Sequence, residues 1–164
     1  MVAAMNPTPD GKMPEDSRCS PREIQKYLGR ISGPLLDRID LHIEVPIVPF
    51  DKISGMVSGE SSEQIKQRVT AARSIQLRRF AESKGIVSNA SMSSRALKAC
   101  CQLDGSSLEL MKQAMAHVGL SARAYDRILK VARTIADLAH QDHIQPDHVM
   151  EAIQFRELDR QIWT

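Results

Sequence analysis

Residues 121–139 read SARAYDRILKVARTIADLA, and this segment says most about the architecture. Ser121 is a typical helix N-cap residue, and apolar residues follow it at intervals of three or four positions. The face that they form comprises Tyr125, Ile128, Leu129, Ala132, Ile135, Ala136 and Ala139. A face this broad predicts a helix in the core of a helical bundle.

The sequence on either side of this segment also has helical spacing. Ser61 and Gln64 form a capping box, which predicts a long helix to about Ser83. Further helices are expected from Ser93 or Ser94 to Cys101, from Asp104 to Gly119, and from Pro146 onward. The chain from residue 61 onward is therefore expected to be helical throughout.

The first third of the chain has a different pattern. The apolar residues Ile39, Leu41, Ile43 and Val45 alternate with the polar residues Asp40, His42 and Glu44. Strict alternation predicts a half-buried strand, and residues 1–5 predict a second, apolar one. Between them, Ser20, Pro21 and Glu23 predict a helix that runs to about Leu28. The expected fold class is mainly α: two strands and a helix from an α/β core, followed by a helical bundle.

The composition excludes several classes of protein. Of 164 residues, 42% are hydrophobic and 26% charged, which is typical of a globular domain rather than a disordered one. The sequence has no apolar run long enough to cross a membrane. Its three cysteines, Cys19, Cys100 and Cys101, form no disulfide framework, so we expect a reducing, cytoplasmic location.

A complete active site is not found in this sequence. Gly11 and Lys12 are followed by Met13 and lack the upstream glycine of a phosphate-binding loop. His140, His143 and His148 could share a metal ion, but histidines near a helix end are more often polar partners of its carbonyl groups. We therefore expect no metal site.

The long helix predicted from Ser61 is strongly basic. Residues 62–84 contain the cations Lys66, Arg68, Arg73, Arg78, Arg79 and Lys84 against the anions Glu63 and Glu82. Such a helix could lie along a phosphate backbone, or it could simply carry a solvated face. The candidate nucleic-acid contacts are Lys66, Arg73, Arg78 and Arg79.

Two other arginines occupy unusual places. Arg38 lies where a short helical turn leads into the alternating segment. Arg123 lies in the first turn of a predicted helix, where the dipole disfavours a cation unless an anion is near. From the pattern alone, both could also be ordinary surface or ion-paired arginines.

Three segments together resemble a known family. They are Ala3-Ala4-Met5-Asn6-Pro7, the run SGPLLDRIDLH at residues 32–42, and residues 119–138, which begin GLSARAY and end ARTIADL. They resemble the C-terminal half of magnesium-chelatase-like AAA+ ATPases of the competence-protein (ComM) type. The resemblance covers nearly the whole chain.

The resemblance implies a role for three side chains. Asn6 matches sensor 1, which orients the attacking water, and Arg38 matches the arginine finger, which reaches a neighbouring subunit's nucleotide. Arg123 matches sensor 2, which contacts the phosphates of its own subunit from a helical lid. The candidate catalytic residues are thus Asn6, Arg38 and Arg123, and Arg123 is also a candidate nucleotide-binding residue. A planar guanidinium suits the charge that spreads over phosphoryl oxygens during transfer.

The resemblance also implies an organisation. Residues 1–49 would be the end of an AAA+ core, residues 50–90 a linker with the basic helix, and residues 91–164 the lid. Family members carry a protease-like domain and the Walker A and Walker B motifs upstream, so the chain looks like a C-terminal fragment. The longer protein would use ATP and Mg²⁺ in a homo-oligomeric, hexameric ring; the fragment alone is expected to bind no cofactor and to be inactive.

One stretch departs from the family. Members usually carry two cysteines near positions 8 and 10 and two more near positions 17 and 19. Here Thr8, Asp10 and Ser17 stand near three of these positions and only Cys19 is a cysteine. We therefore expect no zinc site in this stretch.

Three functions remain open. The first is a DNA motor that translocates or migrates branches, and the second is a chelatase subunit that inserts a metal into a porphyrin. DNA-stimulated ATPase activity of the longer protein would favour the first, and porphyrin-dependent activity the second. The third is a non-enzymatic helical module that binds DNA or a partner through residues 62–84, and it would be favoured if no ATPase domain preceded the chain.

Overall fold

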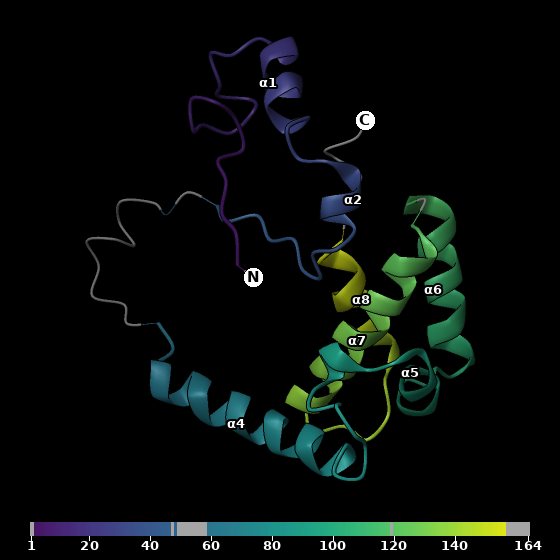
Figure 1. Ribbon diagram of the computed structural model, residues 1–164. Coiled ribbons are helices and arrows are strands. Elements are labelled where there is room, and N and C mark those ends of the chain that lie inside the picture. The colour runs from purple at the N-terminus through teal and green to yellow at the C-terminus, as the bar shows by residue number, and fades with distance from the viewer. Residues whose placement is uncertain (1, 47, 49–58, 119, 157–164) are drawn as a thin grey trace. The chain divides into compact units, whose positions relative to one another are not determined.

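The computed structural model describes residues 2–46, 48, 59–118 and 120–156. These residues fall into two compact units, with residues 2–39 in the first and residues 40–156 in the second. Seven α-helices and one 3₁₀ helix are seen in the described part of the chain (Figure 1). The fold is therefore mainly helical, as expected.

The first unit contains a loop and two short helices. Helix α1 (Pro21–Leu28) begins with the predicted capping box, in which the Glu23 carboxylate accepts from the Ser20 N–H at 2.8 Å. Helix α2 (Gly33–Leu36) follows, with Ser32 at its N-cap and Pro34 in its first turn. Helix α2 confirms the short helical turn expected before Arg38, and a serine before a proline-led turn is a helix-start signal.

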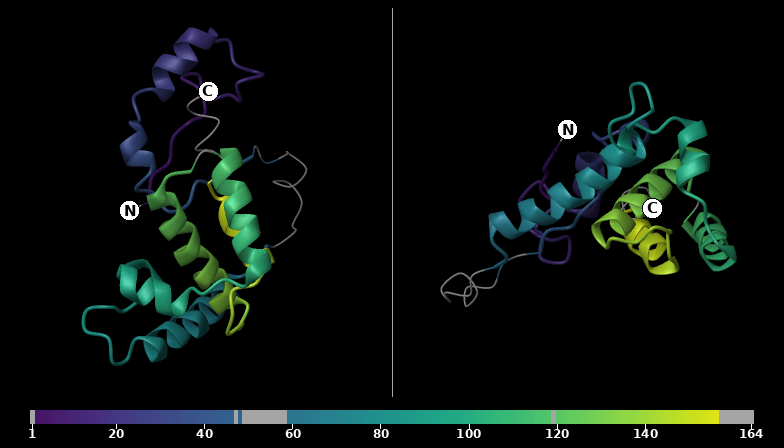
Figure 2. Two further views of the ribbon diagram at one scale, coloured as in Figure 1. Left: turned by 90° about the vertical axis from the view of Figure 1, so that its right-hand side faces the viewer. Right: turned by 90° about the horizontal axis from the view of Figure 1, so that it is seen from below.

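The second unit is a bundle built around one helix. It contains α4 (Ser62–Arg79), η1 (Asn89–Ser91), α5 (Ser94–Cys100), α6 (Gly105–Val118), α7 (Ala122–Leu138) and α8 (Pro146–Gln154). Helix α7 packs against α8, α4, α5 and η1, and α8 also packs against α6 (Figures 1 and 2). The predicted helix starts at Ser61, Ser93 and Ser121 are confirmed, because each serine caps the helix that follows it.

The apolar face of α7 forms the core of this bundle. Ile128, Leu129, Ala132 and Ala136 are buried, as predicted. Each isoleucine or leucine buried in this way contributes about 1.5–3 kcal/mol relative to an exposed one. Ala139, which the pattern placed on the same face, is exposed because the helix ends at Leu138.

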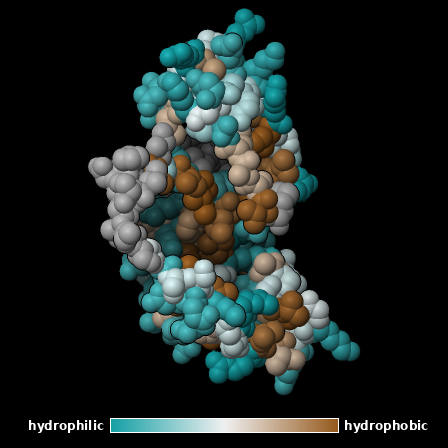
Figure 3. Space-filling view, turned by 90° about the vertical axis from the view of Figure 1, so that its left-hand side faces the viewer, coloured by the Kyte–Doolittle hydropathy of each residue, from teal (hydrophilic) through white to brown (hydrophobic). Residues whose placement is uncertain are grey.

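The two predicted strands are wrong for the residues that the structure describes. Residues 2–5 and 41–46 are neither helical nor paired in a ladder, and Leu41, Ile43 and Val45 are 44%, 64% and 80% exposed. A strand needs a neighbour to pair with its N–H and C=O groups, whereas here the His42 N–H donates to the Phe155 carbonyl at 2.9 Å, outside any ladder. Figure 3 shows hydrophobic residues that reach the surface among hydrophilic ones.

Some predictions fall outside the described residues. They concern residue 1 of the first predicted strand, residues 50–58 of the expected linker, Gly119 at the end of a predicted helix, and residues 157–164 of the expected lid. Within the described part of the chain, no helix is both long and apolar enough to cross a membrane.

Candidate functional site

Asn6, the predicted sensor 1 residue, lies in the first unit with its side chain exposed. The turn after it places Gly11 near its carboxamide, since a Cβ built on Gly11 would lie 3.5 Å from Asn6 Nδ2. Gly11 has a φ of +78°, in the left-handed region that glycine adopts without strain. The carboxamide therefore rests beside a glycine turn and remains open to solvent.

The loop after Asn6 is organised around the Asp10 carboxylate. Asp10 Oδ1 accepts from Ser17 Oγ at 2.8 Å, and Oδ2 accepts from the Arg18 N–H at 3.1 Å. The buried Thr8 hydroxyl lies 2.7 Å from Asp10 Oδ1 and 2.6 Å from the Lys12 carbonyl oxygen. These bonds, the one from Thr8 first, hold the pKa of Asp10 far below its ordinary value.

These residues do not fit a zinc ion. Zinc in structural sites prefers cysteine and histidine ligands, whereas Thr8 and Ser17 supply hydroxyls that are hydrogen-bonded within the loop, to Asp10 and to the Lys12 carbonyl oxygen. Cys19 is a free thiol, and its N–H donates to Ser17 Oγ at 3.1 Å. In the described ranges, no group of three or more histidines, cysteines or acidic residues could hold a metal ion.

Arg38, the predicted arginine finger, follows the C-cap residue of α2. Its side chain is exposed, and its Nη1 donates to the Pro34 carbonyl oxygen at 2.6 Å. This bond ties the guanidinium to the proline-led turn of α2. A guanidinium has five N–H donors, so the bond leaves most of them for another group.

Arg123, the predicted sensor 2 residue, lies in the first turn of α7 and is exposed. The turn is fixed by Ser121, whose Oγ accepts from the Ala124 N–H at 3.2 Å. One turn further along, Arg127 is paired with Asp40. Among the described residues, no acidic side chain is recorded in an ion pair with Arg123.

The structure places these three residues in different units. Asn6 and Arg38 belong to the first unit, and Arg123 belongs to the second. Each is exposed, as a group that contacts nucleotide must be. Their convergence on one triphosphate stays a prediction.

The four candidate nucleic-acid contacts on α4 have different surroundings. Lys66 and Arg78 are exposed, and the half-buried Arg73 donates to the Gln76 carboxamide oxygen at 3.1 Å. Arg79 instead pairs with Asp137 of α7 through both nitrogens, at 2.5 and 2.8 Å. Lys66 and Arg78 thus offer the most accessible charge of the four.

A buried polar network that the sequence analysis missed surrounds this pair. Asn89 donates to Asp137 at 2.8 Å and accepts from Arg79 at 3.0 Å. Arg133, only 2% exposed, donates to Asp137 at 3.1 Å and to the carbonyls of Gln141 and Asp142. The four-residue spacing of Arg133 and Asp137 on a helix was the signal that could have revealed the network.

The network shifts the acid–base properties of its members. Burial alone would raise the pKa of Asp137, but hydrogen bonds from Arg79 and Asn89 outweigh burial and hold this pKa below its ordinary value. The hydrogen bond to Asp137 raises the pKa of Arg79. Both groups are therefore charged at neutral pH, and together they bind α4 to α7.

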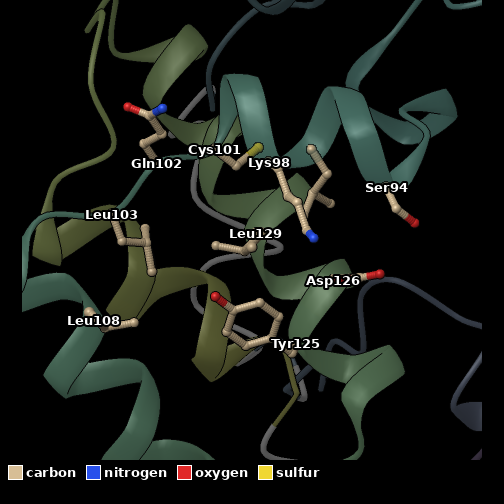
Figure 4. A pocket seen from close by; sticks show the side chains of 10 residues that line it. Ser94, Lys98, Cys101, Gln102, Leu103, Leu108, Tyr125, Asp126 and Leu129 are labelled. Atoms are coloured by element: carbon tan, nitrogen blue, oxygen red, sulfur yellow. The ribbon is translucent and has the colours of Figure 1, made fainter.

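A pocket of about 470 Å³ lies between α5, the start of α6 and α7. Its apolar wall includes Leu97, Leu103 and Leu129, and Lys98 and Asp126 stand beside it (Figure 4). Burial raises the pKa of the Cys101 thiol in this wall to about 12, so it is protonated and a poor nucleophile. The pocket can hold an apolar group but offers no catalytic constellation.

The second unit is a helical bundle with a capped central helix that presents an arginine in its first turn, and it agrees with a C-terminal helical lid. The chain belongs to the magnesium chelatase family. The family model described as magnesium chelatase, subunit ChlI C-terminal, matches residues 59–156, and the model described as magnesium chelatase, subunit ChlI, matches residues 1–53.

Individual relatives cover nearly the whole chain. The uncharacterized protein YifB of Escherichia coli is 43% identical over 162 residues, and the competence protein ComM of Haemophilus influenzae is 41% identical over 162 residues. An uncharacterized protein of Mycobacterium tuberculosis is 34% identical over 158 residues. These matches cover 98%, 98% and 96% of this chain but 31% of each relative. The resemblance read from the motifs is thereby confirmed.

Proposed function

We propose that this chain is the part of an ATP-driven DNA motor that supplies sensor 1, the arginine finger and sensor 2. The observation that carries the proposal is the exposed guanidinium of Arg123 in the first turn of α7, within residues 119–138, one of the segments on which the family resemblance rests. A helix N-terminus attracts anions, and a cation there is unfavourable by about 0.3–1 kcal/mol unless an anion joins it. A phosphate group would satisfy both the helix and the arginine.

The contrast with neighbouring cations on α7 supports this assignment. Arg127 is paired with Asp40, and Lys130 donates to the Ala90 carbonyl oxygen at 3.0 Å. Both therefore serve the fold. Among the described residues, Arg123 is seen in no comparable ion pair or hydrogen bond. The Ser121 cap fixes the turn on which Arg123 lies.

Arg38 and Asn6 would act from the first unit. The bond from Arg38 to Pro34 uses one terminal nitrogen of the guanidinium, and the other donors stay available for a nucleotide on a neighbouring copy of the protein. An arginine finger contributes about 10³–10⁵ in turnover. Asn6 would hold the attacking water by hydrogen bonds without adding charge.

The nucleotide site would be completed by residues outside this chain, which covers 31% of its relatives. ATP would supply the phosphoanhydride bond, and Mg²⁺ would offset charge on its oxygens. The exposed side chains of Arg38 and Arg123 fit a polyanion of this kind. A homo-oligomeric ring is required for Arg38 to act on a neighbour's nucleotide, and we propose a cytoplasmic hexamer.

DNA is the proposed substrate because of α4. Residues 61–70 are exposed on every side, and the N-terminal half of α4 reaches away from α7 (Figure 1). Lys66 and Arg78 present accessible charge, and each phosphate they neutralise would add salt-dependent affinity. One relative is named a competence protein, which agrees with an action on DNA.

A second candidate is suggested by the family description itself, which names magnesium chelatase. The experiment compares ATP turnover of the longer protein alone, with DNA, and with a porphyrin and Mg²⁺. Stimulation by DNA supports the motor, and porphyrin-dependent turnover supports the chelatase. The absence of ATP turnover under every condition would contradict both.

A further inference from the structure

We infer that Asp10 is a positioning residue for the Asn6 carboxamide, and that it acts by pinning the glycine turn on which that carboxamide rests. The inference depends on the proposed role of Asn6 as sensor 1. In this role Asp10 would act through the loop and would not contact the nucleotide itself. Two sets of hydrogen bonds in the loop of residues 6–18, and the proximity of Gly11 to Asn6, support this role.

The first step is that Asp10 closes the loop. Its two oxygens receive the Ser17 hydroxyl at 2.8 Å and the Arg18 N–H at 3.1 Å, from residues seven and eight positions later. Hydrogen bonds to a charged acceptor are stronger than those between neutral groups. Ser17 and Arg18, at the end of the loop, are thus bonded directly to Asp10, which precedes Gly11.

The second step is that Thr8 fixes the turn from within. Its buried hydroxyl contacts both Asp10 Oδ1 and the Lys12 carbonyl oxygen, which belong to the residues on either side of Gly11. The Thr8 carbonyl also accepts from the Gly11 N–H at 3.1 Å. Gly11 is therefore held through its own N–H and through both of its neighbours.

The third step is proximity. Gly11, with φ at +78°, has no side chain, and a Cβ built there would lie 3.5 Å from Asn6 Nδ2, so the turn lies beside the carboxamide. The position of the turn thus limits where the carboxamide can lie. If the turn loosened, the carboxamide would gain freedom on this side.

Greater mobility of the Asn6 carboxamide would affect the chemical step rather than the binding of ATP. A sensor 1 amide orients water, and a displacement of about 1 Å can reduce turnover by about 10². ATP itself would be bound mainly by groups outside this loop. Loss of the Asp10 carboxylate should therefore lower kcat and leave KM for ATP nearly unchanged.

The test is a double-mutant cycle in the longer protein that contains this chain. The variants are Asn6→Ala, Asp10→Asn and both together, with kcat and KM for ATP as readouts and thermal melting as a check of folding. We expect Asp10→Asn to reduce kcat by about 10-fold and Asn6→Ala by about 100-fold. The double variant should be no slower than Asn6→Ala, because Asp10 acts only through the carboxamide.

Two further variants complete the test. Ser17→Ala removes one bond to Asp10 and should lower kcat by a smaller factor, which gives a reading if Asp10→Asn fails to fold. Asp104→Asn is the matched control, because Asp104 is also an exposed carboxylate that accepts from a hydroxyl and a backbone N–H, but in the second unit. It should leave kcat unchanged.

The outcomes separate the inference from the proposal on which it rests. Normal kcat in both Asp10→Asn and Ser17→Ala, or multiplied losses in the double variant, would overturn the positioning role while the role of Asn6 stands. A change in KM alone would also overturn it. Normal turnover in Asn6→Ala would refute sensor 1 and the positioning role together.

Discussion

The Arg79 guanidinium of α4 and the Asp137 carboxylate of α7 form a two-pronged ion pair, with N–O distances of 2.5 and 2.8 Å. Asp137 is fully buried, and the Arg79 side chain is 19% exposed. Arg123 stands in the first turn of the same helix α7, and Asp137 stands in its last. The pair therefore connects the basic helix to the helix that carries the proposed nucleotide sensor.

Replacement of Asp137 by asparagine should destabilise the second unit. It leaves the buried Arg133 and the mostly buried Arg79 without their common anion, and such breakage costs about 3–5 kcal/mol. The free energy of unfolding in urea measures this loss. The control, Glu60→Gln, breaks an exposed pair with Arg68 and should cost less than about 1 kcal/mol.

The same carboxylate should make the fold sensitive to acid. The folded pKa of Asp137 lies below its unfolded value of about 4, so the folded state binds fewer protons in acid. Its contribution is complete above about pH 4 and is lost as the pH falls toward the folded pKa. The unfolding free energy of the wild type should thus fall more steeply below about pH 4 than that of Asp137→Asn. Parallel curves would contradict this account.

These examples show what the sequence could and could not reveal. The capping boxes at Ser20 and Ser61 and the apolar face around Ile128 were predictable because their partners lie within one or two helical turns. The pair of Arg79 with Asp137 joins residues 58 positions apart, and no local pattern encodes it. The strand predicted at residues 39–45 is wrong for a related reason. Alternation indicates a strand, but it does not provide the neighbouring strand that must pair with it.

The residues of the candidate site show the same difference between features that a local pattern encodes and features that depend on the folded chain. Arg123 was recognisable because a cation in the first turn of a helix conflicts with a local rule. The loop around Asp10 was not, because its bonds depend on how residues 8–18 fold back on one another. The burial of Arg79 was equally hidden, since its position on α4 resembles that of the exposed Arg78.

Lys66 and Arg78 are expected to contact DNA phosphates. Replacing either by alanine in the longer protein should weaken binding across sequences and reduce the salt slope, d log K/d log[salt], by about 1 in magnitude. Fluorescence anisotropy with labelled DNA at several salt concentrations measures the slope. Lys112→Ala, which removes an exposed cation of α6, is the control. Equal slopes in all three variants would count against α4 as the DNA surface.

Arg38→Ala in the longer protein should abolish ATP turnover, by about 10³-fold or more, while nucleotide binding stays nearly intact. The reason is that a finger acts on charge that develops in the transition state on a neighbour's nucleotide. Turnover and binding of a fluorescent nucleotide are measured separately. Arg30→Ala, at an exposed arginine of the same unit, should behave like the wild type. Normal turnover in Arg38→Ala would remove the finger assignment.

Arg123→Ala should weaken nucleotide binding as well as turnover, unlike Arg38→Ala. A sensor 2 arginine contacts the phosphates of the bound nucleotide, so its loss should weaken nucleotide affinity by about 10-fold or more as well as slow turnover, since a hydrogen bond between charged groups contributes about 1.5–3 kcal/mol. Arg95→Ala is the matched control, because Arg95 is also an exposed arginine in the first turn of a helix, α5, of the same unit. The affinity for a fluorescent ATP analogue should fall for Arg123→Ala and not for Arg95→Ala. If both variants bind and hydrolyse ATP as the wild type does, α7 presents no nucleotide sensor.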